Sequence, residues 1–186
     1  MATEILQKTG TSFVWANSDY SPGANTSLGT YSATYDIDPI DLAAAAARQS
    51  IKADLGATHA AEYLVDMTWE PVTDPAAGGT IDLYWSESAS GTAAVGNMGG
   101  CTGSDAAFAG YSTVTLAVAL TQMKYIGSFN VGVANDDDGV QIGTVGVFSP
   151  VQRYGCLVVV NNTSVAMHSD SVEFAVRFTP IIPESQ

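Results

Sequence analysis

The chain alternates between apolar and polar residues over eight short stretches, which turn residues separate from one another. In residues 63–70 one face carries Tyr63, Val65, Met67 and Trp69, and the other face carries the intervening residues. Successive side chains of a strand point to opposite faces of a sheet, so this pattern predicts half-buried β-strands. The expected strands are residues 28–37, 60–70, 79–86, 112–120, 123–132, 139–148, 154–161 and 170–179.

Eight such strands with irregular connections predict an all-β fold, a two-sheet β-sandwich of jelly-roll or Greek-key type. A length of 186 residues fits one domain, which we expect to span residues 28–186. Residues 1–27 are predicted to form an N-terminal arm or extension with Trp15 and Tyr20 as anchors. One interpretation is an arm that reaches a neighbouring subunit, and the other is a terminus whose aromatic residues dock on their own domain.

Two segments do not follow the strand pattern. Residues 41–49 contain five consecutive alanines behind Asp38 and Pro39, which is typical of a helix start, yet a strand is also possible there. We slightly favour the extended form. Residues 86–111 form a long loop of small residues, and a loop of this length in a compact domain is usually functional or disordered.

Charge excludes two classes of partner. Acidic residues number 19 and basic residues 6, which gives a formal net charge of −13. The six basic residues are scattered, so no basic stripe exists to neutralise nucleic-acid phosphates, and no polybasic segment exists to bind an anionic membrane. No apolar run approaches the ~20 residues of a membrane-spanning helix, and the first residues do not resemble a signal peptide. Cys101 and Cys156 are therefore expected to be reduced and buried, although the sequence leaves a disulfide open.

A search for catalytic and metal-binding patterns favours a protein that is not an enzyme and needs no cofactor. His59 and His168 lie beside predicted turns, and no nucleophile motif accompanies them. The many carboxylates form no recognisable glycosidase pair. The acidic turn at residues 134–139 resembles a calcium loop, but Ala134 and Val145 occupy positions that need carboxylates. Asp136 and Asp138 stay weak metal candidates.

Several phrases along the chain resemble a known group of proteins. They are residues 48–56 (RQSIKADLG), 79–86 (GTIDLYWS), 96–100 (GNMGG), 153–155 (RYG) and 158–161 (VVVN). In this order they resemble virion proteins of tailed bacteriophages, including jelly-roll proteins that decorate or cement capsids. The resemblance implies a structural protein made in the bacterial cytoplasm and located in the virion. It also implies the major capsid protein or other virion proteins as partners, and a homo-oligomer such as the trimer that the three-fold axes of a capsid would impose.

Three segments are the expected contacts with the capsid or with other subunits. They are the N-terminal arm around Trp15, the Gly-rich loop at residues 91–105, and the residues near Arg153 and Tyr154. They contain the candidate residues Trp15, Tyr20, Asn97, Met98, Arg153 and Tyr154. An alternative is a carbohydrate-binding module on the virion or tail, with sugar rings stacked on exposed Tyr84, Trp85 or Trp69, although alternation favours buried tryptophans. A depolymerase would instead need two converging carboxylates.

Overall fold

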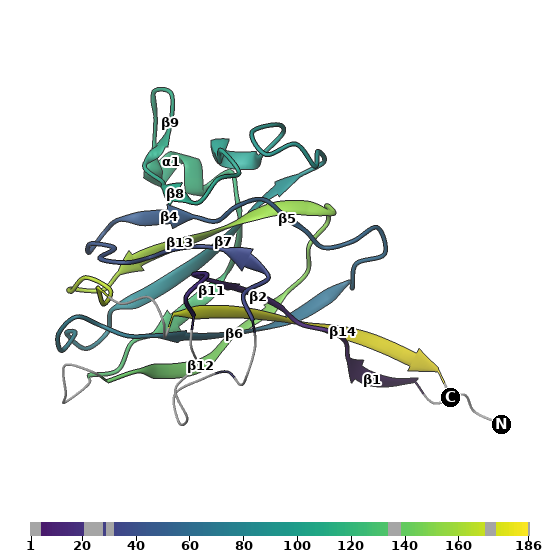
Figure 1. Ribbon diagram of the computed structural model, residues 1–186, viewed down its shortest axis with the longest axis horizontal. Helices are drawn as coiled ribbons and strands as arrows, with labels where there is room; N and C mark the ends of the chain where they lie inside the picture. The colour runs from purple at the N-terminus through teal and green to yellow at the C-terminus, as the bar shows by residue number, and fades with distance from the viewer. Residues whose placement is uncertain (1–4, 21–27, 29–31, 134–138, 170–173, 186) are drawn as a thin grey trace.

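The protein is a β-sandwich of two sheets that are antiparallel except for the pairing of Phe13–Ala16 with Tyr35–Asp36, which confirms the predicted fold class. The computed structural model describes residues 5–20, 28, 32–133, 139–169 and 174–185 (Figure 1). Sheet A contains, in spatial order, β12 (Gln141–Phe148), β6 (Glu62–Trp69), β14 (Ala175–Ser185), β2 (Phe13–Ala16) and β3 (Tyr35–Asp36), with β1 (Ile5–Thr9) also paired to β14. Sheet B contains β11 (Lys124–Asn130), β7 (Thr80–Ser88), β13 (Tyr154–Asn162), β4 (Ala47–Gln49) and β8 (Ala106–Ala107), with β5 (Ala53–Asp54) also paired to β13.

The order of the strands is that of a jelly roll. If the strands β2, β4, β6, β7, β11, β12, β13 and β14 are counted from one to eight, sheet A has the order six–three–eight–one and sheet B the order five–four–seven–two. Consecutive strands therefore cross repeatedly between the sheets, as two Greek keys require. A consequence is that the β4–β6, β7–β11 and β12–β13 connections all leave the sandwich at the same end.

Aromatic side chains fill the space between the two sheets. Phe178 of β14 lies at the centre, with ring centroids 4.3 Å from Trp15, 5.8 Å from Trp85 and 5.4 Å from Phe148. All four side chains are at most 2% exposed. Alternation along β7 places Ile81, Leu83 and Trp85 in this core. The residues between them therefore point to the outer face of sheet B.

A second core lies on that outer face, under residues 97–123, which we call the cap. The cap contains η1 (Met98–Gly100), β9 (Gly110–Tyr111), β10 (Val114–Thr115) and α1 (Leu116–Leu120), and it lies above sheet B in Figure 1. Its Cys101, Phe108 and Ala119 are buried against outward-facing residues of the sheet, namely Ala47, Cys156, Val158 and Val160. This covering explains why β13 is buried on both faces and has a continuous apolar sequence.

The predicted strand at residues 112–120 is wrong. Only Val114–Thr115 is extended, and α1 follows directly. Leu116, Ala119 and Leu120 have the spacing i, i+3 and i+4, so one helical face meets sheet B while Val118 is exposed. The apolar residues of 112–120 fit both the alternation of a strand and the spacing of a helix. The helix forms because its apolar face packs against the second core.

Residues 41–49 contain no helix, and Ala47–Gln49 forms strand β4, in line with the favoured extended form. The predicted strand at 28–37 is reduced to Tyr35–Asp36 among its described residues. The last predicted strand begins at Ala175 in the structure and continues to Ser185, and residues 170–173 lie outside the described part. Inside the predicted loop 86–111, β7 continues to Ser88, and η1, β8 and β9 are also formed.

The described part of the N-terminal segment belongs to sheet A. Trp15 is fully buried in β2, between β14 and β3, so it packs in its own domain and does not extend toward a neighbour. Tyr20 packs against a small cluster that includes Val14 and Ala175. Before β2, strand β1 pairs with the end of β14, from Thr9 opposite Ile181 to Ile5 opposite Ser185. We call residues 5–9 and 181–185 the ribbon, which extends beyond the sandwich (Figure 1).

Gly155 allows β13 to pass beside a core tryptophan. A Cβ atom at this position would lie 2.2 Å from Cε2 of Trp85. We expect Gly155→Ala to lower the free energy of unfolding by about 1–3 kcal/mol, because the indole must move within a filled core. Urea unfolding measures this change. Gly146→Ala on β12 is the matched control, since its nearest atom would lie at 3.7 Å, and equal losses for the two variants would contradict the packing described.

Candidate functional site

Two of the three predicted contact segments lie together at one end of sheet B. Ser88, at the end of β7, pairs with Tyr154 at the start of β13. A Cβ atom on Gly91 would lie 3.2 Å from the Tyr154 ring, so the loop after β7 rests against this side chain. We call residues 88–105 with residues 151–154 the loop surface. The third segment, around Trp15, is not part of it.

Lys52 fixes the start of this loop. Its Nζ atom donates to the Ser88 hydroxyl at 3.0 Å and to three carbonyl oxygens, those of Ser90 at 2.9 Å, Thr92 at 2.6 Å and Val95 at 2.8 Å. An ammonium has three protons, so the four acceptors share them around one positive charge. Burial lowers the pKa of Lys52. No pattern in the sequence marks Lys52 as an anchor, since three of its four partners are backbone oxygens.

The predicted contact residues Asn97 and Met98 have different environments. The Asn97 amide nitrogen donates to the carbonyl oxygens of Ala93 at 2.7 Å and Cys101 at 2.6 Å, so this side chain closes its own turn. Met98 is 52% exposed and Val95 is 51% exposed. The loop therefore presents apolar side chains to the outside from a turn whose backbone is held by hydrogen bonds.

Arg153 and Tyr154 form the second part of the loop surface. The Arg153 guanidinium donates from Nε and Nη2 to the two carboxylate oxygens of Asp54, each at 2.6 Å. It also lies 4.8 Å from the centroid of the Tyr154 ring, in a cation–π arrangement. The hydrogen bonds from Arg153 and from the Gly56 amide hold the pKa of Asp54 below its usual value, against the opposing effect of partial burial.

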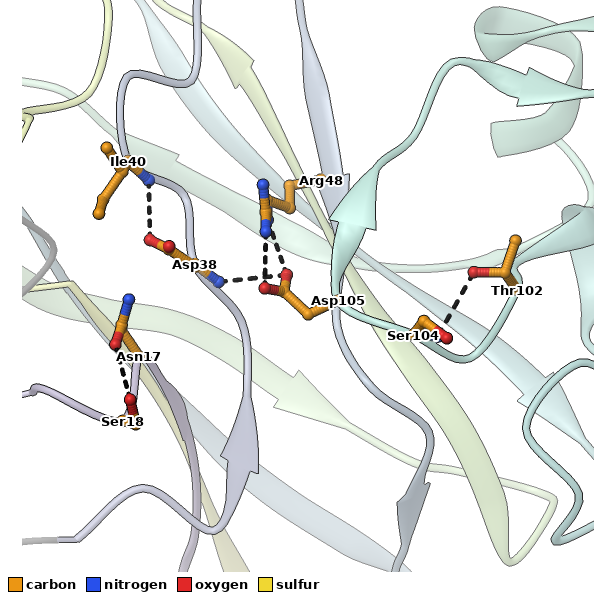
Figure 2. Close-up of polar contacts among 8 residues, drawn as sticks. All are labelled: Asn17, Ser18, Asp38, Ile40, Arg48, Thr102, Ser104 and Asp105. Atoms are coloured by element: carbon orange, nitrogen blue, oxygen red, sulfur yellow. Dashed lines mark hydrogen bonds and ion pairs between the residues drawn. The ribbon is translucent and has the colours of Figure 1, made fainter.

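A second bidentate ion pair fixes the far end of the loop. Nε and Nη2 of Arg48 each donate at 2.6 Å to the carboxylate of Asp105, which also accepts from the backbone amide of Asp38 at 3.2 Å (Figure 2). Beside this pair, Gln49 donates to the Thr102 hydroxyl at 2.9 Å and accepts from the Thr102 amide at 2.8 Å. Both ends of the loop are thus tied to β4 or to the segment that follows it.

Carboxylates gather around Arg48 without forming a metal site. Burial first, and then the negative charges of Asp105 and Asp38, raise the pKa of Asp36. Within the described ranges there is no group of three or more His, Cys, Asp or Glu side chains placed to hold a metal ion. The candidates Asp136 and Asp138 lie outside the described residues. The described part of the chain also holds no helix long and apolar enough to span a membrane.

Cys101 of the cap and Cys156 of β13 are free thiols, and both are buried, as expected. The neighbouring Cys101 thiol, together with burial, raises the pKa of the Cys156 thiol. The thiols therefore lie where the cap meets sheet B.

Other residues weighed in the sequence lie away from the loop surface or inside the core. Trp69 and Trp85 are fully buried, so neither offers a flat face to a sugar. His168 lies 3.6 Å from the Glu70 carboxylate, and His59 lies 3.4 Å from the Gly56 carbonyl oxygen. The two histidines thus have separate surroundings in the fold.

Comparisons with known proteins found no matching family model, no similar curated protein and no similar solved structure.

Lys52→Met tests the anchoring of the loop. The substitution keeps the apolar stem and removes the donor, so we expect cleavage by a nonspecific protease within residues 89–97 and a loss of about 1–3 kcal/mol in the free energy of unfolding. Limited proteolysis with mass spectrometry checks the site of cleavage. Lys124→Met on β11 is the matched control, and equal protection of residues 89–97 in both variants would contradict the role of Lys52.

Asp54→Asn tests the Arg153 ion pair through pH. The lowered pKa of Asp54 means that the pair stabilises the fold above the ordinary value of 3.8 and ceases to do so as pH falls through the lowered value. Since the pair is partly exposed, we expect a loss of no more than about 1 kcal/mol at pH 7. Urea unfolding at several pH values should show this difference shrinking below pH 3.8.

Arg153→Gln removes the same pair from the other side. In the variant that carries both Asp54→Asn and Arg153→Gln, the free energy of unfolding should fall by less than the sum of the two single decreases. The reason is that each single substitution already removes the same ion pair. A decrease in the free energy of unfolding of Asp54→Asn that does not change with pH would contradict the assigned Arg153–Asp54 ion pair. Full additivity of the two decreases in the double variant would contradict it as well.

Proposed function

We propose that this protein is a structural component of a tailed-bacteriophage particle, a decoration or cement protein that binds across capsomer junctions and stabilises the head. The five phrases quoted above support this proposal through their resemblance to such proteins. The jelly-roll sandwich and the acidic composition are compatible with it, since a protein on the outside of a shell has no need to bind the packaged DNA.

The observation that carries the proposal is that the ribbon and the loop surface lie at the same end of the sandwich. Ile181, where the ribbon begins, pairs with Glu62 at the start of β6. The connection that leads into β6 contains Lys52 and Asp54, which hold the loop surface. Two features of different chemistry therefore lie toward the end of the sandwich where β6 begins and β7 ends.

The ribbon supplies backbone groups for association. Among the described residues β1 pairs only with β14, so its other edge has free N–H and C=O groups. An isolated two-stranded ribbon is only marginally stable in water, and an open edge is a template for pairing with another chain. A strand of a neighbouring subunit or of the capsid would complete this edge.

The loop surface supplies side chains for association. Met98 and Val95 are exposed on a loop fixed at both ends, so little conformational entropy is lost when they are covered. Tyr154 contacts the same loop at Gly91, and Tyr154 and its neighbour Arg153 are of the residue types enriched in protein interfaces. Many symmetric copies, each with modest contacts of this kind, would bind a shell durably through multivalency.

Co-sedimentation with shells of the source phage that lack this protein tests the proposal. We expect saturable binding, and greater resistance of the decorated shells to heat and low salt. A variant without residues 1–9 should fold, because β2 remains paired to β14, but should bind at least tenfold more weakly if the ribbon contributes about 1.4 kcal/mol or more.

Met98→Ser is the companion variant for the loop surface, and its unfolding midpoint should match that of the unchanged protein because Met98 is exposed. Absence of binding by the intact protein would contradict the proposed function. Undiminished binding by both variants would contradict the proposed contact surface while leaving the function standing.

A further inference from the structure

A groove lies where the cap stops covering the outer face of sheet B. It has a volume of about 590 Å³ and is open to the outside. The sheet contributes Asp82, Tyr84 and Tyr125, and the cap contributes Leu120, Thr121 and Met123. Sites for small molecules commonly have this size and combine an apolar wall with a few fixed polar groups.

Two tyrosines from neighbouring strands form the aromatic wall. Tyr84 of β7 pairs directly with Tyr125 of β11, and their ring centroids are 5.2 Å apart with an interplanar angle of 57°. Tyr125 is 52% exposed and lines the groove, so its side chain is accessible to a ligand there. A bulge between Tyr125 and Gly127 sets this register, and it keeps Tyr125 on the outer face while Ile126 enters the core.

A fixed carboxylate lies at the end of this wall. Asp82 accepts from the Ser128 hydroxyl at 2.5 Å and from the Asn162 amide at 2.7 Å, one bond to each carboxylate oxygen. Ser128 is in turn hydrogen-bonded to the Tyr125 hydroxyl. Each carboxylate oxygen can accept two hydrogen bonds, so each has capacity for one more donor besides the bond described here, and Asp82 lines the groove.

This arrangement has the chemistry of a site for a sugar ring. A pyranose has an apolar face of C–H groups, which stacks on an aromatic ring, and a rim of hydroxyls, which donate strongly to a carboxylate. Burial and the nearby charge of Asp82 raise the pKa of Tyr84, so its hydroxyl stays protonated and can donate as well. Apolar peptides would leave the acceptor positions of Asp82 unpaired.

The charge of the groove narrows the class of sugar. Its described lining contains one carboxylate and no lysine or arginine, and the whole chain has a formal net charge of −13. An acidic sugar would meet repulsion without a cationic partner, whereas the hydroxyls of a neutral sugar need only acceptors.

We propose that the groove formed by Asp82, Tyr84, Tyr125 and the Leu120–Met123 edge of the cap binds a neutral hexopyranose unit of a glycan, with Tyr125 as the stacking face and Asp82 as the acceptor of two hydroxyls. This binding site goes beyond the proposed capsid function and does not depend on it. Of the three aromatic residues considered for a sugar site from the sequence, Tyr84 lines this groove, whereas Trp69 and Trp85 are buried in the core.

Saturation-transfer NMR on the intact protein tests the site, because it detects weak binding. The probes are the methyl glycosides of glucose, galactose, mannose and N-acetylglucosamine, with sialyllactose as the anionic comparator. We expect transfer to at least one neutral sugar, strongest at the ring C–H protons, and markedly weaker transfer to the sialic acid ring.

Variants assign the binding to the groove. Tyr125→Ala should weaken binding about five- to tenfold through loss of stacking, and Tyr125→Phe, which keeps the ring, should bind within about threefold of the unchanged protein. Asp82→Asn should weaken binding about tenfold. Val147→Ala, an exposed apolar position on sheet A, is the control and should change nothing.

Two results would overturn the proposal. The first is absence of transfer to every neutral sugar tested at concentrations of tens of millimolar. The second is binding that survives both Tyr125→Ala and Asp82→Asn. Circular dichroism of each variant confirms its fold, and capsid co-sedimentation of the same variants separates this site from the loop surface.

Discussion

The packing of Phe178 against Trp15 and Trp85 is the contact on which the rest of the structure depends. It joins β14 and β2 of sheet A to β7 of sheet B, strands that are far apart in the sequence. Aromatic side chains bury more apolar surface than any others, so this cluster dominates the hydrophobic stabilisation of the sandwich. It also fixes which face of β7 points inward. The outward direction of Asp82, Tyr84 and Ser86 follows directly from the burial of Ile81, Leu83 and Trp85.

The outer face of sheet B is where the fold departs from a plain sandwich. An ordinary sandwich would leave this face to solvent, but here the cap covers part of it with a second apolar core. The first part of the cap is held to sheet B by the Arg48–Asp105 ion pair, by the hydrogen bonds of Gln49 with Thr102, and by Cys101, which is buried against Cys156. The two proposed binding surfaces lie at the borders of this cover, with the loop surface at one border and the groove at another.

The long strands were predictable because each offers enough positions for alternation to stand out. Residues 60–70, 79–86, 123–132, 139–148 and 154–161 correspond to β6, β7, β11, β12 and β13. Strands β3, β5, β8 and β9 have two residues each, too few for a period to be visible.

The geometry of the site was less predictable than the strands. The proximity of Arg153 to the Gly-rich loop follows from jelly-roll topology, which alternation alone does not specify. The anchoring by Lys52 left no trace in the sequence because backbone carbonyls accept most of its hydrogen bonds. The pairing of Tyr84 with Tyr125 depends on a bulge that composition does not reveal.

The position of the ribbon has a mechanical consequence. Ile5 lies opposite Ser185, so tension that separates the chain at these two points acts across the hydrogen bonds of β1 and β14 and breaks them one after another. Such unzipping needs less force than shearing a whole strand at once, and the ribbon is the first part of sheet A that it opens. The pairing of β2 with β14 and the aromatic core behind it bear the load only after the ribbon has separated.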